Sequence, residues 1–373
     1  MHILTSSSNE VPDITEEQVE ALKAQGFTSG LAISLKENII NLPLRFWILD
    51  NSGSMSKPDG HRIISTRPNN DIKIDDCTRW EELRECTQYH INLSALVGAP
   101  TKFRLLNTPP ASVGSGHFGI AHRGRDMIDE EVEKATGIIM KARPGGPTPL
   151  TKHIHDIQKE IQGMAHSLES QGKRVAIIVA TDGLPTDDLG NTNNTTKQLF
   201  INSLRGLESL PVWLVIRICT DEVEVVNFYN GLDNKLELSL DVLDDFVAEG
   251  LEVHEHNPWL TYGLPLHHLR VMGFHDRVFD MLDQRKLTKG GELMDFCRIL
   301  FGIDKFDGVA DPSVDWNSFE ESIEELLEQE KLQYNPVKKT MMPWINVKKL
   351  HKLYGDRSHH LAAFLHRGRR TAS

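Results

Sequence analysis

The chain has 373 residues, 39% of them hydrophobic and 25% charged, which is enough for one large domain or two ordinary domains with a sizeable core. Its formal net charge of −12 argues against nucleic-acid or anionic-membrane binding by the whole surface, and no apolar run is long enough to span a bilayer. The first residues lack the basic and apolar segments of a secretory signal, and the four cysteines form no C-x-x-C pair. We therefore expect a cytoplasmic or nuclear protein with reduced thiols.

The N-terminal element, residues 1–42, contains TEEQVEALKAQGFTSGLAISLKENIIN, which predicts two short helices around a Gly-Phe turn. Thr15 is a suitable N-cap residue for the first helix. This stretch is similar to the first two helices of a ubiquitin-associated domain, and that resemblance implies ubiquitin binding through the Gly-Phe turn. The alternative is a structural cap in which Leu22 and Phe27 pack on the neighbouring domain.

Four short apolar runs predict buried strands, and helical patterns lie between them. The strands are expected in PLRFWILD (43–50), KFRLLN (102–107), RVAIIVATDG (174–183) and VWLVIRIC (212–219), and the helices at 79–97, 129–142, 151–170 and 196–208. Strands that alternate with helices predict an α/β fold with a doubly wound, mainly parallel sheet that has helices on both faces.

A polar insert, residues 56–79, follows the first predicted strand. In it HRIIST and DIKIDDCT flank RPNN, which predicts a hairpin. We expect this hairpin to overhang the loop after the first strand. The hairpin either restricts access of a partner to the site or helps to recognise that partner. The alternative is that it is a surface insertion that the fold merely tolerates.

The C-terminal part predicts a helical extension at 261–331 and a basic tail at 332–373. Residues 315–330 carry seven acids and no base, whereas nine Lys or Arg residues and one acid, Asp356, follow from Lys338 onward. This asymmetry predicts a solvated acidic helix that pairs with the basic tail. The alternative is that the tail contacts RNA or an acidic partner.

Oxygen-bearing side chains follow two of the predicted strands. Asp50, Ser52 and Ser54 stand in WILDNSGSM, Asp182 follows RVAIIVAT, and Thr148 lies in the loop GGPTPL. Because the carboxyl ends of parallel strands meet at one edge of a sheet, these side chains are expected to lie close together. Two carboxylates and three hydroxyls form a hard, all-oxygen set that suits Mg²⁺ or Mn²⁺.

The three motifs together, D-x-S-x-S, a downstream loop threonine and a strand ending T-D-G, resemble the von Willebrand factor type A domain with its metal-ion-dependent adhesion site. The resemblance covers about residues 43–260. It implies a Rossmann-like sheet with one antiparallel edge strand. It also implies that Ser52, Ser54 and Thr148 ligate the ion while the two aspartates bind directly or through water. The protein would then be no enzyme but a module that binds an acidic residue of a protein partner.

The sequence departs from this family at one position. Family members commonly have the threonine directly after Gly-Gly, whereas Pro147 precedes Thr148 here, so Thr151 is a second candidate ligand. Two other functions stay open. One is a scaffold with a structural or vestigial metal site. The other is a Mg²⁺-dependent phosphohydrolase, which needs a second acid where Ser52 stands, although TDGLPTDD resembles a second acidic metal motif with Asp187 and Asp188 after Asp182.

Several histidines and aromatic residues are expected to have structural roles. Zinc needs three or four convergent ligands, and nothing in the spacing supplies cysteine partners. We therefore expect ordinary core or surface histidines, and we expect Trp259 and Tyr262 to anchor the C-terminal helices to the sheet. The histidine groups are His153/His155, His254/His256, His267/His268 and His359/His360.

Overall fold

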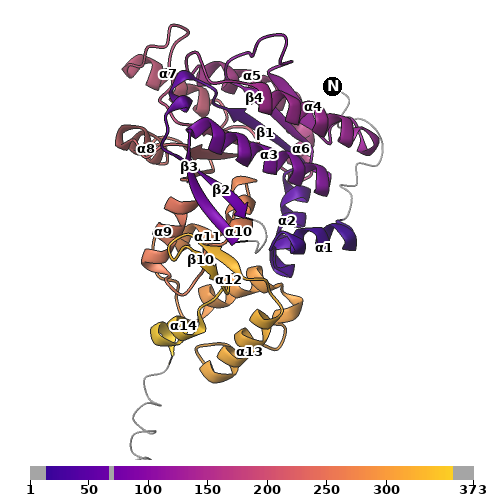
Figure 1. Cartoon of the computed structure of the whole chain (residues 1–373), viewed down its shortest axis with the longest axis vertical. Coiled ribbons are helices and arrows are strands. Elements are labelled where there is room, and N and C mark those ends of the chain that lie inside the picture. The colour runs from indigo at the N-terminus through magenta and orange to yellow at the C-terminus, as the bar shows by residue number, and fades with distance from the viewer. Residues whose placement is uncertain (1–13, 67–70, 356–373) are drawn as a thin grey trace, which may run out of the picture. The chain divides into compact units, whose positions relative to one another are not determined.

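The computed structural model describes residues 14–66 and 71–355 (Figure 1). This part of the chain forms two compact units. The first contains residues 14–22, 33–248 and 267–274, and the second contains residues 23–32, 249–266 and 275–355. The predicted N-terminal element (1–42) and helical extension (261–331) are each divided between the units.

The first unit is built on a six-stranded, mostly parallel sheet flanked by helices, so the α/β class predicted from the sequence is confirmed. The strand order is β5-β4-β1-β6-β7-β8, and within this sheet β5 alone runs antiparallel to its neighbour. The strands are β1 (Leu44–Leu49), β4 (Thr101–Leu105), β5 (His117–Ile120), β6 (Val175–Thr181), β7 (Val212–Ile218) and β8 (Leu240–Leu243).

Two apolar cores cover the two faces of this sheet. β1, β6 and β7 are buried at every position, as expected for strands covered on both sides. Phe46 belongs to one core with Ile154 of α5, whereas its neighbour Trp47 belongs to the other core with Leu83 of α3 and Ile138 of α4. The helices are α3 (Arg79–Val97), α4 (Ile128–Lys141), α5 (Leu150–Gln162), α6 (Ala165–Ser170), α7 (Asn194–Arg205) and α8 (Val223–Asn230), with short 3₁₀ turns at Gly53–Ser56, Arg125–Met127 and Asp304–Phe306.

The structure corrects two details of the predicted elements. The single helix expected at 151–170 is wrong, because the chain ends α5 at Gly163 and restarts as α6. Glycine has a low helix propensity, which explains a break at this position. The strand β8 has no counterpart in the prediction, and β5 was expected only as the antiparallel edge strand that the family resemblance implies, without residue bounds, since each has only four residues.

The insert contains an antiparallel hairpin of β2 (Gly60–Thr66) and β3 (Asp71–Cys77). The intervening residues 67–70 lie outside the described residues. The root of the hairpin borders the loop after β1. β2 lies along α3, where the His61 amide donates to the Glu82 carboxylate at 2.9 Å.

The second unit is mainly helical. Trp259 is fully buried and packs edge-on against Phe296 and near Tyr354, so in this unit it anchors C-terminal helices to one another. Tyr262 is also buried. The elements are α11 (Arg277–Leu282), α12 (Gly291–Phe301), α13 (Trp316–Glu328), β9 (Gln333–Asn335), β10 (Thr340–Met342) and α14 (Val347–Tyr354), while α9 (Phe246–His256) and α10 (Leu264–Val271) contribute residues to both units.

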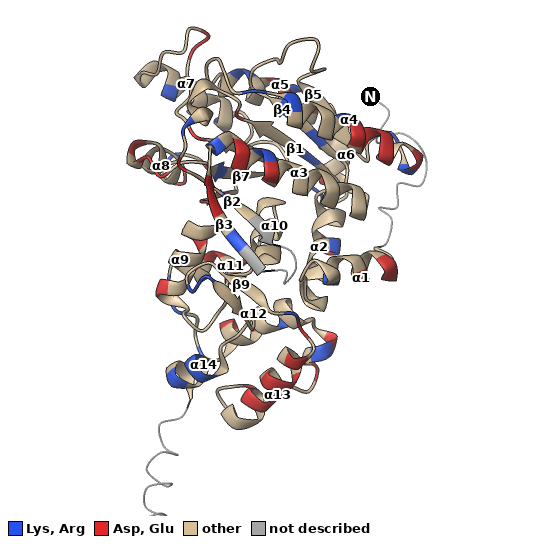
Figure 2. Ribbon diagram, in the orientation of Figure 1, with Lys and Arg blue, Asp and Glu red and all other residues tan. Residues whose placement is uncertain are grey.

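The acidic helix of the second unit is only partly exposed to solvent, whereas the sequence predicted a solvated helix. Figure 2 shows acidic residues along α13 and basic residues on α14. α13 is amphipathic, however, because Trp316 and Phe319 are buried. His351 of α14 lies 2.8 Å from the Glu320 carboxylate of α13, and the pairing of the acidic helix with the Lys and Arg residues of the tail stays a prediction. The rest of the predicted basic tail, 356–373, lies outside the described residues.

The N-terminal segment forms α1 (Glu16–Ala24) and α2 (Ser29–Asn41). Thr15 caps α1, because its hydroxyl accepts from the Gln18 amide at 3.3 Å while the Gln18 side chain accepts from the Thr15 amide at 2.8 Å. Leu22 and Phe27 are both buried. Burial of Phe27 favours the structural cap, and ubiquitin binding stays a prediction.

Candidate metal site

Asp50 and Asp182 lie where the strand order reverses. β1 has β4 on one side and β6 on the other, and ligands of open α/β sheets bind beyond the carboxyl ends of the strands at such a point. Asp50 directly follows β1, and Asp182 directly follows β6. Both side chains are buried. Two acids from distant motifs therefore lie at the same edge of the sheet.

Asp50 fixes the backbone of the loop that follows it. One carboxylate oxygen accepts from the Ser52 amide at 2.8 Å, and the other accepts from the Thr181 hydroxyl at 2.6 Å. Each oxygen keeps a second lone pair that a water or a cation could use. Asp50 thus ties the loop after β1 to the end of β6.

Ser52, Ser54 and Asp182 form a continuous chain of oxygens. The Ser54 hydroxyl donates to the Asp182 carboxylate at 2.7 Å, and the Ser52 and Ser54 hydroxyls lie 3.0 Å apart. The 3₁₀ turn at Gly53–Ser56 points both serine side chains to the same side. The structure therefore brings these three predicted residues into direct contact.

Thr148 faces the same point as Ser54. A methyl group placed on Gly183 would lie 3.5 Å from the Thr148 hydroxyl and 3.9 Å from the Ser54 hydroxyl. The small space beside Gly183 is thus lined by hydroxyls from two separate loops. Thr151 instead lies in the first turn of α5, so Thr148 is the better placed of the two candidate threonines.

Backbone hydrogen bonds hold the loop after β1 against the loop that carries Thr148. The Gly53 amide donates to the Gly146 carbonyl at 3.1 Å, and the Gly145 amide donates to the Asn51 carbonyl at 2.8 Å. Gly146 has a φ of +93°, and a methyl group there would lie 2.6 Å from the Asn107 side-chain oxygen. Only glycine fits this position, which explains the G-G-P sequence before Thr148.

Arg79 binds three acids around the site. Its guanidinium is 2% exposed and donates to Asp182 at 2.9 Å, to both oxygens of Asp59 at 2.6 Å, and to Glu222 at 3.0 Å. Asp59 stands at the root of the hairpin, and Glu222 precedes α8. Arg79 therefore joins the hairpin, the end of β6 and the start of α8 through one buried cation.

Burial is the largest single influence on the pKa values of Asp50, Asp182 and Arg79. It raises the pKa of Asp50 to about 6, with a further contribution from the negative charge of Asp182. Burial also raises the pKa of Asp182, while hydrogen bonds from Ser54 and Arg79 oppose that shift. For Arg79, burial lowers the pKa, but the hydrogen bonds to Asp59, Asp182 and Glu222 outweigh burial and raise it. Two neighbouring buried carboxylates favour an additional positive charge.

The donor set fits a hard divalent cation. The hydroxyls of Thr148 and Ser54 face the space beside Gly183, Ser52 and Asp182 contact Ser54, and Mg²⁺ prefers oxygen ligands and retains several waters. Ser52, Ser54 and Thr148 are the residues that would hold the ion directly. Asp50, whose oxygens orient the loop, would act through water.

Four residues of this arrangement were absent from the sequence prediction. The Tyr229 hydroxyl donates to the Gly183 carbonyl at 2.8 Å, and Asn51 and Asn107 exchange side chain to backbone hydrogen bonds at 3.0 and 2.8 Å. Asn107 is the last residue of the run KFRLLN and lies two residues after β4, so a search for polar residues at every strand end would have found it. Arg79 is the fourth such residue. It is the first residue of a helix, where a positive charge is unfavourable, and this unfavourable position could have indicated that acidic side chains surround it.

A second group of ligand-type residues joins the hairpin to the sheet. His61, Glu82 and Asp245 offer atoms within 4.8 Å of one another. Glu82 pairs with the buried Arg217, and one carboxylate oxygen of Asp245 accepts from the amides of residues 247 and 248. His61 lies 3.5 Å from Asp245. This group is therefore best explained as an ion-pair network.

The predicted histidine groups form no metal cluster among the described residues. His153 hydrogen-bonds to the Leu106 carbonyl at 3.0 Å, and His268 stacks on Tyr89 with ring centroids 3.7 Å apart. These are core contacts, as expected. His359 and His360 lie outside the described residues.

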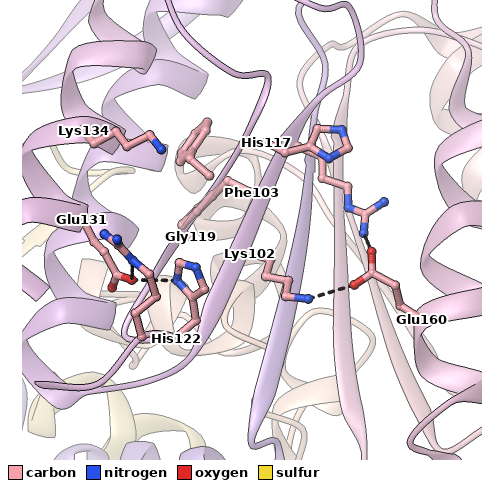
Figure 3. A pocket seen from close by; sticks show the side chains of 11 residues that line it. Lys102, Phe103, His117, Gly119, His122, Glu131, Lys134 and Glu160 are labelled. Atoms are coloured by element: carbon pink, nitrogen blue, oxygen red, sulfur yellow. Dashed lines mark hydrogen bonds and ion pairs between the residues drawn. The ribbon is translucent and has the colours of Figure 1, made fainter. Parts of the chain in front are cut away.

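A charged hollow of about 340 Å³ lies beside β4 and β5 (Figure 3). Lys102 and Arg104 on one side pair with Glu160, and His122 on the other side lies 2.9 Å from Glu131. Lys102 and Arg104 share the single carboxylate of Glu160, and Arg123 and Lys134 also line the hollow, so it has more basic than acidic side chains.

No family model matches this chain, and no curated protein sequence is similar to it. Among the described helices, none has the length and apolar composition of a membrane span. The assignment of the metal site therefore depends on the geometry of its loops.

Replacing Arg79 tests the role of the buried cation. Arg79→Ala leaves Asp182 buried without its ion-pair partner, and we expect a loss of about 3–5 kcal/mol in unfolding free energy, measured by urea titration in EDTA. Mg²⁺ should restore part of this loss. Asp59→Asn removes an exposed partner of the same guanidinium and should cost about 0–1 kcal/mol. Equal effects of the two substitutions would contradict the role given to Arg79.

The pair of His61 and Asp245 predicts a pH dependence of stability. The interaction with Asp245 raises the pKa of His61 to about 9, above its value of about 6.5 in an unfolded chain. Its stabilising contribution is therefore complete below about pH 6.5 and is lost as the pH rises through about 9. The difference in unfolding free energy between the wild-type protein and His61→Gln, measured in EDTA, should shrink over this range. A constant difference would argue against a charged pair.

Proposed function

We propose that this chain contains a von Willebrand factor type A-like domain that binds Mg²⁺ or Mn²⁺ and, through the ion, an acidic residue of a protein partner. The single observation that carries the proposal is the contact of Ser52 and Ser54 with Asp182 at the strand-order reversal, where the Thr148 hydroxyl faces the same space beside Gly183. Neutral hydroxyls beside buried carboxylates suit ion binding, so binding is the function that we propose for this set.

The residues of the site have separate roles in this proposal. A bound divalent cation supplies a positive charge with exchangeable coordination positions, one of which a partner carboxylate can occupy. Ser52, Ser54 and Thr148 hold the ion with neutral oxygens, which leaves much of its charge available to an external acid. Asp50 holds the loop after β1 in shape, and Asp182 positions the Ser54 hydroxyl.

The hairpin root is well placed to respond to the ion. Asp182 contacts Arg79, which in turn contacts Asp59 at the hairpin root and Glu222 before α8. A change in the charge around Asp182 would therefore alter the ion pairs that hold the hairpin root and the start of α8. This arrangement supports a site in which metal and partner occupancy alter the loops that border it.

One observation favours the alternative of a scaffold with a structural site. Arg79 already neutralises Asp182, so the loops have a charge-compensated arrangement without an added ion. In that case Asp182→Ala lowers stability but leaves partner binding unchanged. The phosphohydrolase gains no such support, because Asp187 accepts from the amides of Leu189 and Asn191 within its own turn.

Calorimetric titration of Mg²⁺ and Mn²⁺ tests the proposed site. We expect Thr148→Ala and Asp50→Ala each to weaken binding about 10- to 100-fold, because a ligand or its orienting residue is lost. Thr151→Ala is the matched control, since it removes the same hydroxyl three positions along the chain and should leave the affinity unchanged. A parent protein that binds neither ion would overturn the proposal.

A further inference from the structure

The charged hollow beside β4 and β5 shares no lining residue with the candidate metal site (Figure 3). Its walls come from β4, β5, the turn after β5, α4 and α5, all of which belong to the first unit. Four Lys or Arg side chains and two Glu side chains line it, which is an excess of two positive charges in a chain with a net charge of −12. Such a local excess attracts anions. The basic residues are Lys102, Arg104, Arg123 and Lys134, and the acids are Glu131 and Glu160.

The shape of the hollow depends on Gly119 of β5. In the antiparallel pair Gly119 lies opposite Lys102, so no β5 side chain stands directly opposite this lysine. The chain turns at Ala121, whose φ is +56°, and the His122 ring comes back over Gly119. A methyl group on Gly119 would lie 2.9 Å from His122 Nδ1 and 3.0 Å from the Thr101 carbonyl oxygen, so a larger residue would displace the ring. The edge strand thus leaves room beside Lys102 that a side chain would otherwise fill.

Lys102 and Arg104 are held in position by other side chains of the domain. They are two residues apart on β4, so they project to the same face of the sheet. Their cationic groups lie 5.2 and 5.3 Å from the ring centroid of Phe46, and both donate to the Glu160 carboxylate. An ammonium or a guanidinium has several N–H donors, so a bond to Glu160 leaves others for a ligand. Because these side chains are already ordered, an anion would bind them at a low cost in conformational entropy.

The other two basic side chains belong to the turn after β5 and to α4. The Arg123 guanidinium donates to the buried Glu131 carboxylate at 3.0 Å, and His122 Nδ1 lies 2.9 Å from the same oxygen. Lys134, one turn along α4 from Glu131, has no hydrogen bond or ion pair from its side chain within the described part of the chain. The Lys134 ammonium is therefore available to an anion in the hollow.

We propose that this hollow binds a small phosphate monoester. Such an anion carries about two negative charges at pH 7, which matches the excess positive charge of the lining. Its oxygens accept hydrogen bonds from several directions, and the cations stand on β4, on the turn after β5 and on α4. The volume of about 340 Å³ lies at the lower end of the range for ligand sites and leaves room for an organic group of a few atoms. This inference goes beyond the proposed metal site and does not depend on it.

Calorimetric titration of the full chain with glycerol phosphate tests the inference, in buffer from which a chelating resin has removed divalent ions. We expect saturable binding of glycerol phosphate and no binding of glycerol. Lys134→Gln and Lys102→Gln should each weaken binding about tenfold, because a charge-assisted contact with the phosphate is lost. Lys141→Gln is the matched control, since it removes the same charge from another exposed lysine of α4 that lies outside the lining, and it should leave the affinity unchanged.

Three results would overturn this inference. One is the absence of saturable glycerol phosphate binding by the wild-type chain. Another is an equal loss of affinity in Lys134→Gln and Lys141→Gln, because the anion would then respond only to overall charge. The third is malonate binding as tight as that of glycerol phosphate, because the hollow would then select two negative charges without preferring phosphate. Since divalent ions are absent throughout, none of these results bears on the proposed metal site.

Discussion

The central constraint in this structure is the burial of two aspartates at one edge of the sheet. Asp50 and Asp182 end adjacent strands, and both lie out of contact with solvent. A buried carboxylate is stable only when hydrogen bonds and positive charge compensate for lost water. The hydroxyls of Thr181 and Ser54, the guanidinium of Arg79 and the shape of the surrounding loops all meet this requirement.

This constraint explains why so many separate segments converge at the site. Asp50 and Asn51 hold the loop after β1, Gly146 lets the next loop approach it, and Arg79 gathers acids from the hairpin and from the start of α8. Because Arg79 compensates the charge of Asp182, the loops of the site are held together without an added ion. In the function proposed above, the site would form first and accept a cation afterwards.

The sequence was informative where a strong local pattern coincided with a strand end. The runs WILD and VAIIVATD are apolar up to an aspartate, so both the strands and the meeting of the two aspartates at one edge could be predicted. Thr148 was predicted from its motif, and its hydroxyl and that of Ser54 both face the space beside Gly183 despite the intervening Pro147.

The sequence was uninformative where contacts are long-range or elements are short. Arg79 meets Asp182 and Glu222 across more than a hundred residues, and no local period encodes such a contact. The residues of β5 and β8 were not located in the sequence because four residues give little periodicity. The division of α10 between two units depends on tertiary packing, which composition alone does not reveal.

The most direct measurement of the central claim is an anomalous-scattering map from crystals of the protein grown with Mn²⁺. The account predicts a single strong peak beside Gly183, within coordination distance of the hydroxyls of Ser52, Ser54 and Thr148. A peak instead at His61, Glu82 and Asp245, or no peak beside Gly183 at saturating Mn²⁺, would contradict it.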